Sequence, residues 1–173
     1  MPIPPFAFST FLIPTLLATS LSAAAGLPGA GQASGSFTVN GQTIEIHHAY
    51  ARAAPHDGGL RHFIVLTDVP VEAELLNDHF KMWDRSREGK LHYQLIERDP
   101  DGAANRKITL YHPDLGSMGY MSTGAEGYEF EEIVLTAERI EARAYMTEPM
   151  TGFDNAWLYD VKFTASIRVG ETW

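Results

Sequence analysis

Alternation of apolar and polar residues is the feature that most constrains the fold of this chain. In the stretch SFTVNGQTIEIHHAYA, residues 36–51, two alternating runs flank the dipeptide Asn40-Gly41. Asn-Gly is a strong hairpin signal, because a type I′ turn needs positive φ at both of its central residues. We therefore predict a hairpin that closes on this turn and pairs Phe37 with Ile44.

The same period of two recurs through most of the chain that follows. The segment RHFIVLTDV, residues 61–69, is apolar on both faces in its middle, which predicts a central strand. The alternating runs add up to about nine short strands, which is typical of an antiparallel β-sandwich or barrel. A mainly β fold is therefore the predicted class.

One segment has helical spacing instead. In PVEAELLNDHFKMWDRS, residues 70–86, apolar residues and one histidine recur at intervals of three and four, with Gly89 just beyond the end. We predict a single α-helix in this segment that covers the sheet. The predicted buried face consists of Leu75, Leu76, His79, Phe80 and Trp83.

The N-terminal region differs in composition from the rest. Residues 6–25 carry no charge, and the first ionisable side chain is that of Glu45. We interpret residues 1–25 as a signal peptide, with an uncleaved membrane anchor as the alternative. Residues 26–35 are predicted to be a flexible linker and residues 36–173 a single β-rich domain. The protein is then exported, to the periplasm or outside the cell, and it meets a membrane only if residues 1–25 are retained.

Composition narrows the functional classes. The chain has 173 residues, a formal net charge of −9 and no cysteine. An acidic surface repels phosphate backbones, so we expect no nucleic-acid partner. The lack of cysteine excludes thiol catalysis and thiolate metal sites. No phosphate-binding or nucleophile-elbow motif is present in the sequence.

Histidines cluster between residues 47 and 62, and a metal site is one interpretation of the cluster. His48, His56 and His62 are the tentative ligands for copper or zinc, and they meet only if two strands pair around the loop between them. His47 and His48 are adjacent on a strand and point to opposite faces, with His48 predicted on the apolar one. The simpler alternative is that these histidines are hydrogen-bonded or solvated, and that no resident cofactor is present.

The leading hypothesis is a non-enzymatic binding or interaction module for an unknown small molecule or protein. Its candidate surface is the loop before the last strand, where Phe153, Asp154 and Asn155 combine an apolar ring with two hydrogen-bonding groups. A metal-binding protein is the alternative.

A hydrolase is the third hypothesis. It rests on Ser117, His112 and Asp114, which supply the residue types of a catalytic triad close together in the sequence.

Overall fold

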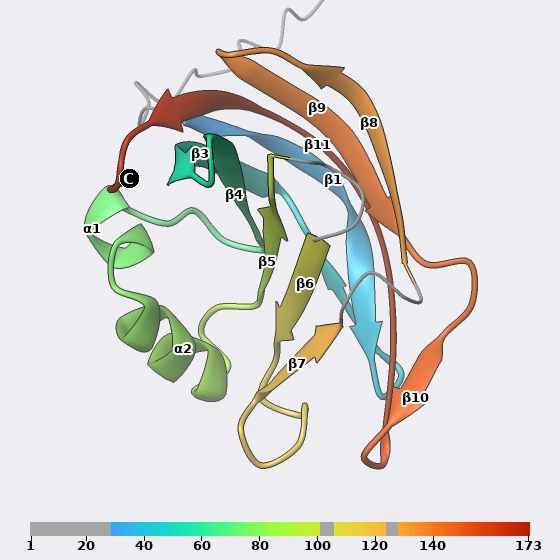
Figure 1. Ribbon diagram of the computed structural model, residues 1–173. Helices are drawn as coiled ribbons and strands as arrows, with labels where there is room; N and C mark the ends of the chain where they lie inside the picture. The colour runs from blue at the N-terminus through green and yellow to red at the C-terminus, as the bar shows by residue number, and fades with distance from the viewer. Residues whose placement is uncertain (1–28, 101–105, 124–127) are drawn as a thin grey trace, which may run out of the picture.

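The computed structural model describes residues 29–100, 106–123 and 128–173, which form one curled sheet and two helices (Figure 1). The strands are β1 (Ala30–Val39), β2 (Gln42–Glu45), β3 (His48–His56), β4 (Gly59–Thr67), β5 (Tyr93–Arg98), β6 (Arg106–Tyr111), β7 (Tyr120–Thr123), β8 (Glu129–Leu135), β9 (Arg139–Tyr145), β10 (Met150–Gly152) and β11 (Asn155–Val169). The helices are α1 (Ala73–Leu76) and α2 (His79–Arg87).

The strands follow the order β7-β6-β5-β4-β3-β1-β11-β9-β8, with β2 added beside β1 and β10 beside β11. All pairings are antiparallel except a short parallel one between β3 and β11. Figure 1 shows the sheet curling into a half-barrel, with α1 and α2 outside the wall made by β4 and β5. The prediction of a mainly β fold is confirmed, and the curl makes it a half-barrel rather than two stacked sheets.

The Asn40-Gly41 turn is as predicted, whereas the strand that follows it is interrupted. Asn40 and Gly41 both have positive φ, and Phe37 pairs with Ile44. Residues 46–47 interrupt the strand and separate β2 from β3. As a result, the second half of β1 pairs with β2 and the first half of β1 pairs with β3. The break changes the side-chain parity. His48 therefore shares a face with Tyr50, and the prediction that it shares the face of Ile46 is wrong.

The first half of β1 occupies part of the segment expected to be a linker. Ala30 to Gly35 pair with β11 or β3 instead of forming a free connection. Glycine has a packing role in this strand, because a Cβ on Gly31 would lie 1.9 Å from the carbonyl oxygen of Thr164. Small residues thus allow the two strand backbones to approach closely. The predicted signal peptide, residues 1–25, lies outside the described residues.

The predicted single helix is two helices. α1 ends at Leu76, with Asn77 as its C-cap. Asp78 is the N-cap of α2, and its carboxylate accepts a hydrogen bond from the backbone N–H of Lys81. Because the Asp78 cap starts a new helix, the continuous helical spacing of the sequence does not correspond to one continuous helix. Met82 is buried, whereas His79 is exposed and Phe80 is 72% exposed, so the predicted buried face is wrong at His79 and Phe80.

Two hydrophobic cores lie on opposite faces of the wall formed by β3 to β6. The larger core fills the inside of the curl, and its members come from all the main strands, for example Phe37, Ile64 and Phe163. The smaller core lies on the outer face under the two helices and includes Tyr93, Leu76 and Trp173. β4 is central, as predicted, between β3 and β5. In the described part of the chain, neither helix has the length and apolar character needed to cross a membrane.

Candidate ligand-binding site

A cavity of about 300 Å³ lies between the helices and the outer face of strands β3 to β6. We call it the cap cavity. Most of its wall is apolar or aromatic, and a few charged or hydrogen-bonding side chains complete it. The lining residues are Arg52, Phe63, Val65, Leu76, His79, Met82, Tyr93, Leu95, Glu97, Lys107, Thr109, Tyr111 and Trp173.

Strand alternation builds the floor of the cap cavity. Phe63 and Val65 on β4 lie two residues apart, so both point to the outer face, while Ile64 between them enters the larger core. The register of the sheet then aligns residues of neighbouring strands in rows across the cavity floor. In one such row Val65 pairs with Leu95, and Leu95 pairs with Thr109. The sheet register therefore forms one wall of the cavity. Leu76, His79 and Met82 of the helical segment form part of the opposite wall.

One end of the cap cavity is aromatic. The rings of Tyr93 and Tyr111 are stacked, with centroids 4.1 Å apart. The Tyr93 hydroxyl is buried beside that of Tyr111, and the Tyr111 hydroxyl lies 3.4 Å from Nε2 of His79. Burial, reinforced by the neighbouring Tyr111 hydroxyl, raises the pKa of Tyr93, and burial raises the pKa of Tyr111 to about 12. Both phenols stay neutral at physiological pH and can offer hydrogen bonds but no charge.

The other end of the cap cavity carries Arg52. Its guanidinium lies 4.1 Å from the centre of the Phe63 ring and 5.6 Å from that of Trp173. Nη1 donates to the Gly170 carbonyl at 3.5 Å, while Nε is buried without a partner. Burial lowers the pKa of Arg52, and the charge of Glu171 opposes this effect without forming an ion pair with it. An arginine keeps its charge nonetheless.

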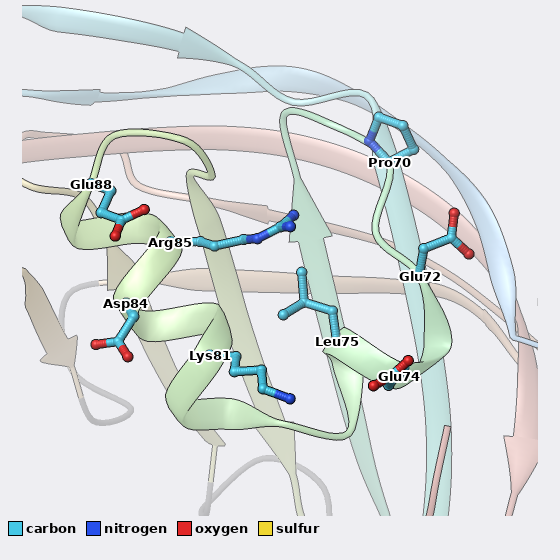
Figure 2. A pocket seen from close by; sticks show the side chains of 8 residues that line it. All are labelled: Pro70, Glu72, Glu74, Leu75, Lys81, Asp84, Arg85 and Glu88. Carbon is cyan, nitrogen blue, oxygen red and sulfur yellow. The ribbon is translucent and has the colours of Figure 1, made fainter.

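A second hollow, of about 440 Å³, lies on the other side of α2, and we call it the charged cleft. Figure 2 shows Arg85 and Leu75 extending into the space beside Pro70, whereas Asp84 and Glu88 point away from it. Only Pro70 and Leu75 are apolar among its lining residues. A lining made mostly of charged side chains differs from the apolar and aromatic lining of an ordinary small-molecule site. The cap cavity is therefore the better candidate.

The structure separates the histidines that the sequence nominated as metal ligands. His48 pairs with Thr67, whereas His62 pairs with Ala53 five residues further along β3, and alternation places the two histidines on opposite faces. His56 lies at the β3–β4 turn, where its ring contacts the guanidinium of Arg61. His48, His56 and His62 are not brought together. Across the described ranges, no three histidine, aspartate or glutamate side chains are grouped to hold a metal ion.

The segment with Phe153, Asp154 and Asn155 is a tight hairpin turn between β10 and β11 rather than a long loop. Phe153 and Asp154 both have positive φ, and Phe153 is 87% exposed. Asn155 is buried, and its amide bonds to Asn40 and to the Phe153 carbonyl. Its hydrogen-bonding capacity is thus used to join two hairpins, and the three residues do not share one surface.

Two of the three proposed triad residues meet. The backbone N–H of Asp114 donates to Nδ1 of His112 at 3.1 Å, and His112 is fully buried. The Asp114 carboxylate lies 4.0 Å from the same nitrogen. Ser117 is exposed, and no hydrogen bond joins it to either residue. Because Nδ1 accepts from a backbone N–H, the proton of a neutral His112 resides on Nε2.

Sequence reasoning missed a histidine–aspartate pair and most of the cap cavity. The Asp68 carboxylate accepts hydrogen bonds from the ring Nδ1 and the backbone N–H of His92, whose ring centre is 5.0 Å from that of His112. Asp68 ends one strand and His92 precedes the next, so a correct prediction of the β4–β5 pairing would have joined them. Arg52 and Tyr93 gave no signal in the sequence, because each stands in an ordinary alternating run.

Comparison with protein-family models, with curated proteins and with solved structures finds no match for this chain. The functional argument therefore rests on the geometry of the cap cavity.

Proposed function

We propose that this protein binds a small, mainly apolar organic molecule in the cap cavity. One observation carries the proposal: an aromatic-walled cavity is lined by Arg52, whose guanidinium makes no hydrogen bond to a carboxylate in the described part of the chain. Cavities with mainly apolar walls and a few polar groups are the usual sites of small organic ligands.

The composition of the wall supports binding. Stacked tyrosines, Phe63 and Trp173 present flat apolar surfaces, and the volume lies at the lower end of the range for small-molecule sites, about 300–1,000 Å³. Thr109 and His79 add hydrogen-bonding groups that can orient a ligand. The proposal keeps the interpretation of an exported binding module. Export stays a prediction from the sequence, whereas a copper or zinc site gains no support, because His48, His56 and His62 are not brought together.

The test uses a neutral aromatic probe, N-phenyl-1-naphthylamine, whose fluorescence rises when it leaves water. We expect saturable binding by the wild-type protein at one site. The substitution Leu95→Trp fills the cavity floor from β5 and should abolish that binding, because Leu95 lies between Val65 and Thr109.

The matched control is Val169→Trp, which adds the same side chain at a residue that is 59% exposed and outside the cavity lining. It should bind the probe like the wild type. Binding that survives in Leu95→Trp, or no saturable binding by the wild type, would contradict the proposed function.

A further inference from the structure

We infer that the ligand of the cap cavity carries a carboxylate, which pairs with Arg52 at the mouth of the cavity. The inference rests on the proposed function and names the chemical class of the ligand: an amphipathic organic acid with a flat, apolar body.

Arg52 makes no ion pair with a carboxylate among the described residues. Its guanidinium lies near the rings of Phe63 and Trp173, and its one hydrogen bond is a long one to the Gly170 carbonyl. Glu171 attracts this cation without forming an ion pair with it among the described residues, so the cost of its desolvation is only partly compensated. Guanidinium groups bind carboxylates through two parallel hydrogen bonds, and the two Nη groups of Arg52 offer one such pair of donors, since Nε is enclosed by protein atoms.

The other charges at the mouth support an anionic ligand. Nζ of Lys107 lies 3.6 Å from Oε1 of Glu97, so the charges of these two side chains largely neutralise each other. Arg52 then remains as the net charge of the lining. The lining side chains thus carry a net positive charge in a protein whose formal net charge is −9, which favours an anion over a cation in the cavity. A cationic ligand would be repelled by Arg52, and the carboxylate of the lining, that of Glu97, is already paired.

Sheet register sets the orientation of the ligand. Arg52 pairs with Phe63, and Phe63 pairs with Glu97, which is four residues from Tyr93 along β5. At about 3.3 Å per residue, the arginine row and the Tyr93 row are roughly 13 Å apart. The carboxylate therefore lies at the Arg52 end, the apolar body crosses Val65 and Leu95, and the far end of the ligand lies against the stacked rings of Tyr93 and Tyr111.

The experiment compares three probes with the same aromatic body: 2-naphthoate, 2-naphthalenemethanol and 2-naphthylmethylammonium. Calorimetric titration of the full-length protein should show at least tenfold tighter binding of the carboxylate than of the alcohol, and the weakest binding for the ammonium. The substitution Arg52→Met keeps an apolar stem and should remove the preference for the carboxylate while leaving the alcohol bound.

Arg87→Met is the matched control, since Arg87 also stacks on an aromatic ring, that of Trp83, but does not line the cavity. It should keep the preference. If Arg52→Met does not fold, Arg52→Lys retains the charge without the planar fork and should weaken the preference. Equal affinity of the wild type for carboxylate and alcohol would overturn the inference alone. Failure of every probe, N-phenyl-1-naphthylamine included, would overturn the proposed function as well.

Discussion

The Asp68 carboxylate holds His92 at two points, accepting from its backbone N–H at 2.9 Å and from its ring Nδ1 at 2.7 Å. The pair lies where β4 ends and β5 begins, after an excursion that contains both helices. It therefore closes the long connection that carries the cap and fixes the start of β5. Burial opposes ionisation of Asp68, but the bonds from His92 outweigh it and the pKa of Asp68 is lowered.

Replacing Asp68 by alanine should destabilise the protein. Hydrogen bonds to a charged group contribute about 1.5–3 kcal/mol each in favourable cases, so we expect a loss of about 2–4 kcal/mol in the free energy of unfolding. Urea denaturation followed by circular dichroism measures it. Asp160→Ala is the control, because Asp160 pairs with Arg143 on an exposed face, where such pairs contribute at most about 1 kcal/mol. Equal losses in the two variants would contradict the structural role of Asp68.

Stability should fall as the pH is lowered from 8 towards 5. Burial lowers the pKa of His48, His62 and His112 below the ordinary histidine value of 6.5. The unfolded state then binds more protons than the folded state in the window below that value, and stability decreases there as the pH decreases. The stability that these histidines contribute is complete above the unfolded pKa and is lost as the pH falls through their folded pKa values.

The measurement is the urea midpoint at several pH values between 8 and 5. The variant His112→Gln should show a smaller decrease over this window than the wild type. The variant His79→Gln, which changes an exposed ring, is the control and should follow the wild type. A midpoint that stays constant or rises on acidification would refute the predicted direction.

Close approach of β1 and β11 predicts a severe effect of one added methyl group. A Cβ at residue 31 would lie 1.9 Å from the Thr164 carbonyl oxygen, and the backbone can relieve this only by moving. We expect Gly31→Ala to lower the free energy of unfolding by about 2 kcal/mol or more, since overpacking typically costs about 1–3 kcal/mol. Gly152→Ala is the comparison, because its Cβ would meet only the Trp157 ring at 3.5 Å. Similar thermal midpoints for both variants would contradict the close pairing of β1 with β11 at Gly31.

The turn residue Phe153 should be replaceable without loss. It has a φ of 51°, which costs energy for a residue with a side chain, and its ring is almost fully exposed. Glycine accepts this conformation, so Phe153→Gly should leave stability unchanged or raise it by up to about 1 kcal/mol. Binding of N-phenyl-1-naphthylamine should be unaffected. Weaker binding by this variant would instead implicate the hairpin tip.

The features that could be predicted from the sequence are those encoded by local pattern. Asn40-Gly41 specifies a hairpin through backbone conformation alone, and alternation in residues 61–69 identified the central strand. Two kinds of feature were missed, a local helix cap and a strand pairing between distant segments. The Asp78 cap divides a segment whose helical spacing looked continuous into two helices. Gly31 and Gly35 lie in the part of β1 that pairs closely with β11, where the composition had indicated a linker. The candidate site combines residues from β3 to β6, the helices and Trp173, so it becomes visible only once the strand order is known.

The most direct test of the central claim is to map where 2-naphthoate binds, by following the ¹⁵N–¹H spectrum of the wild-type protein during titration. If the cap cavity is the site, the largest shifts will be those of the amides of Phe63, Leu95 and Thr109 and of the Trp173 indole. Shifts confined to the Phe153 turn or to the charged cleft around Arg85, with the β4–β6 amides unchanged, would contradict it.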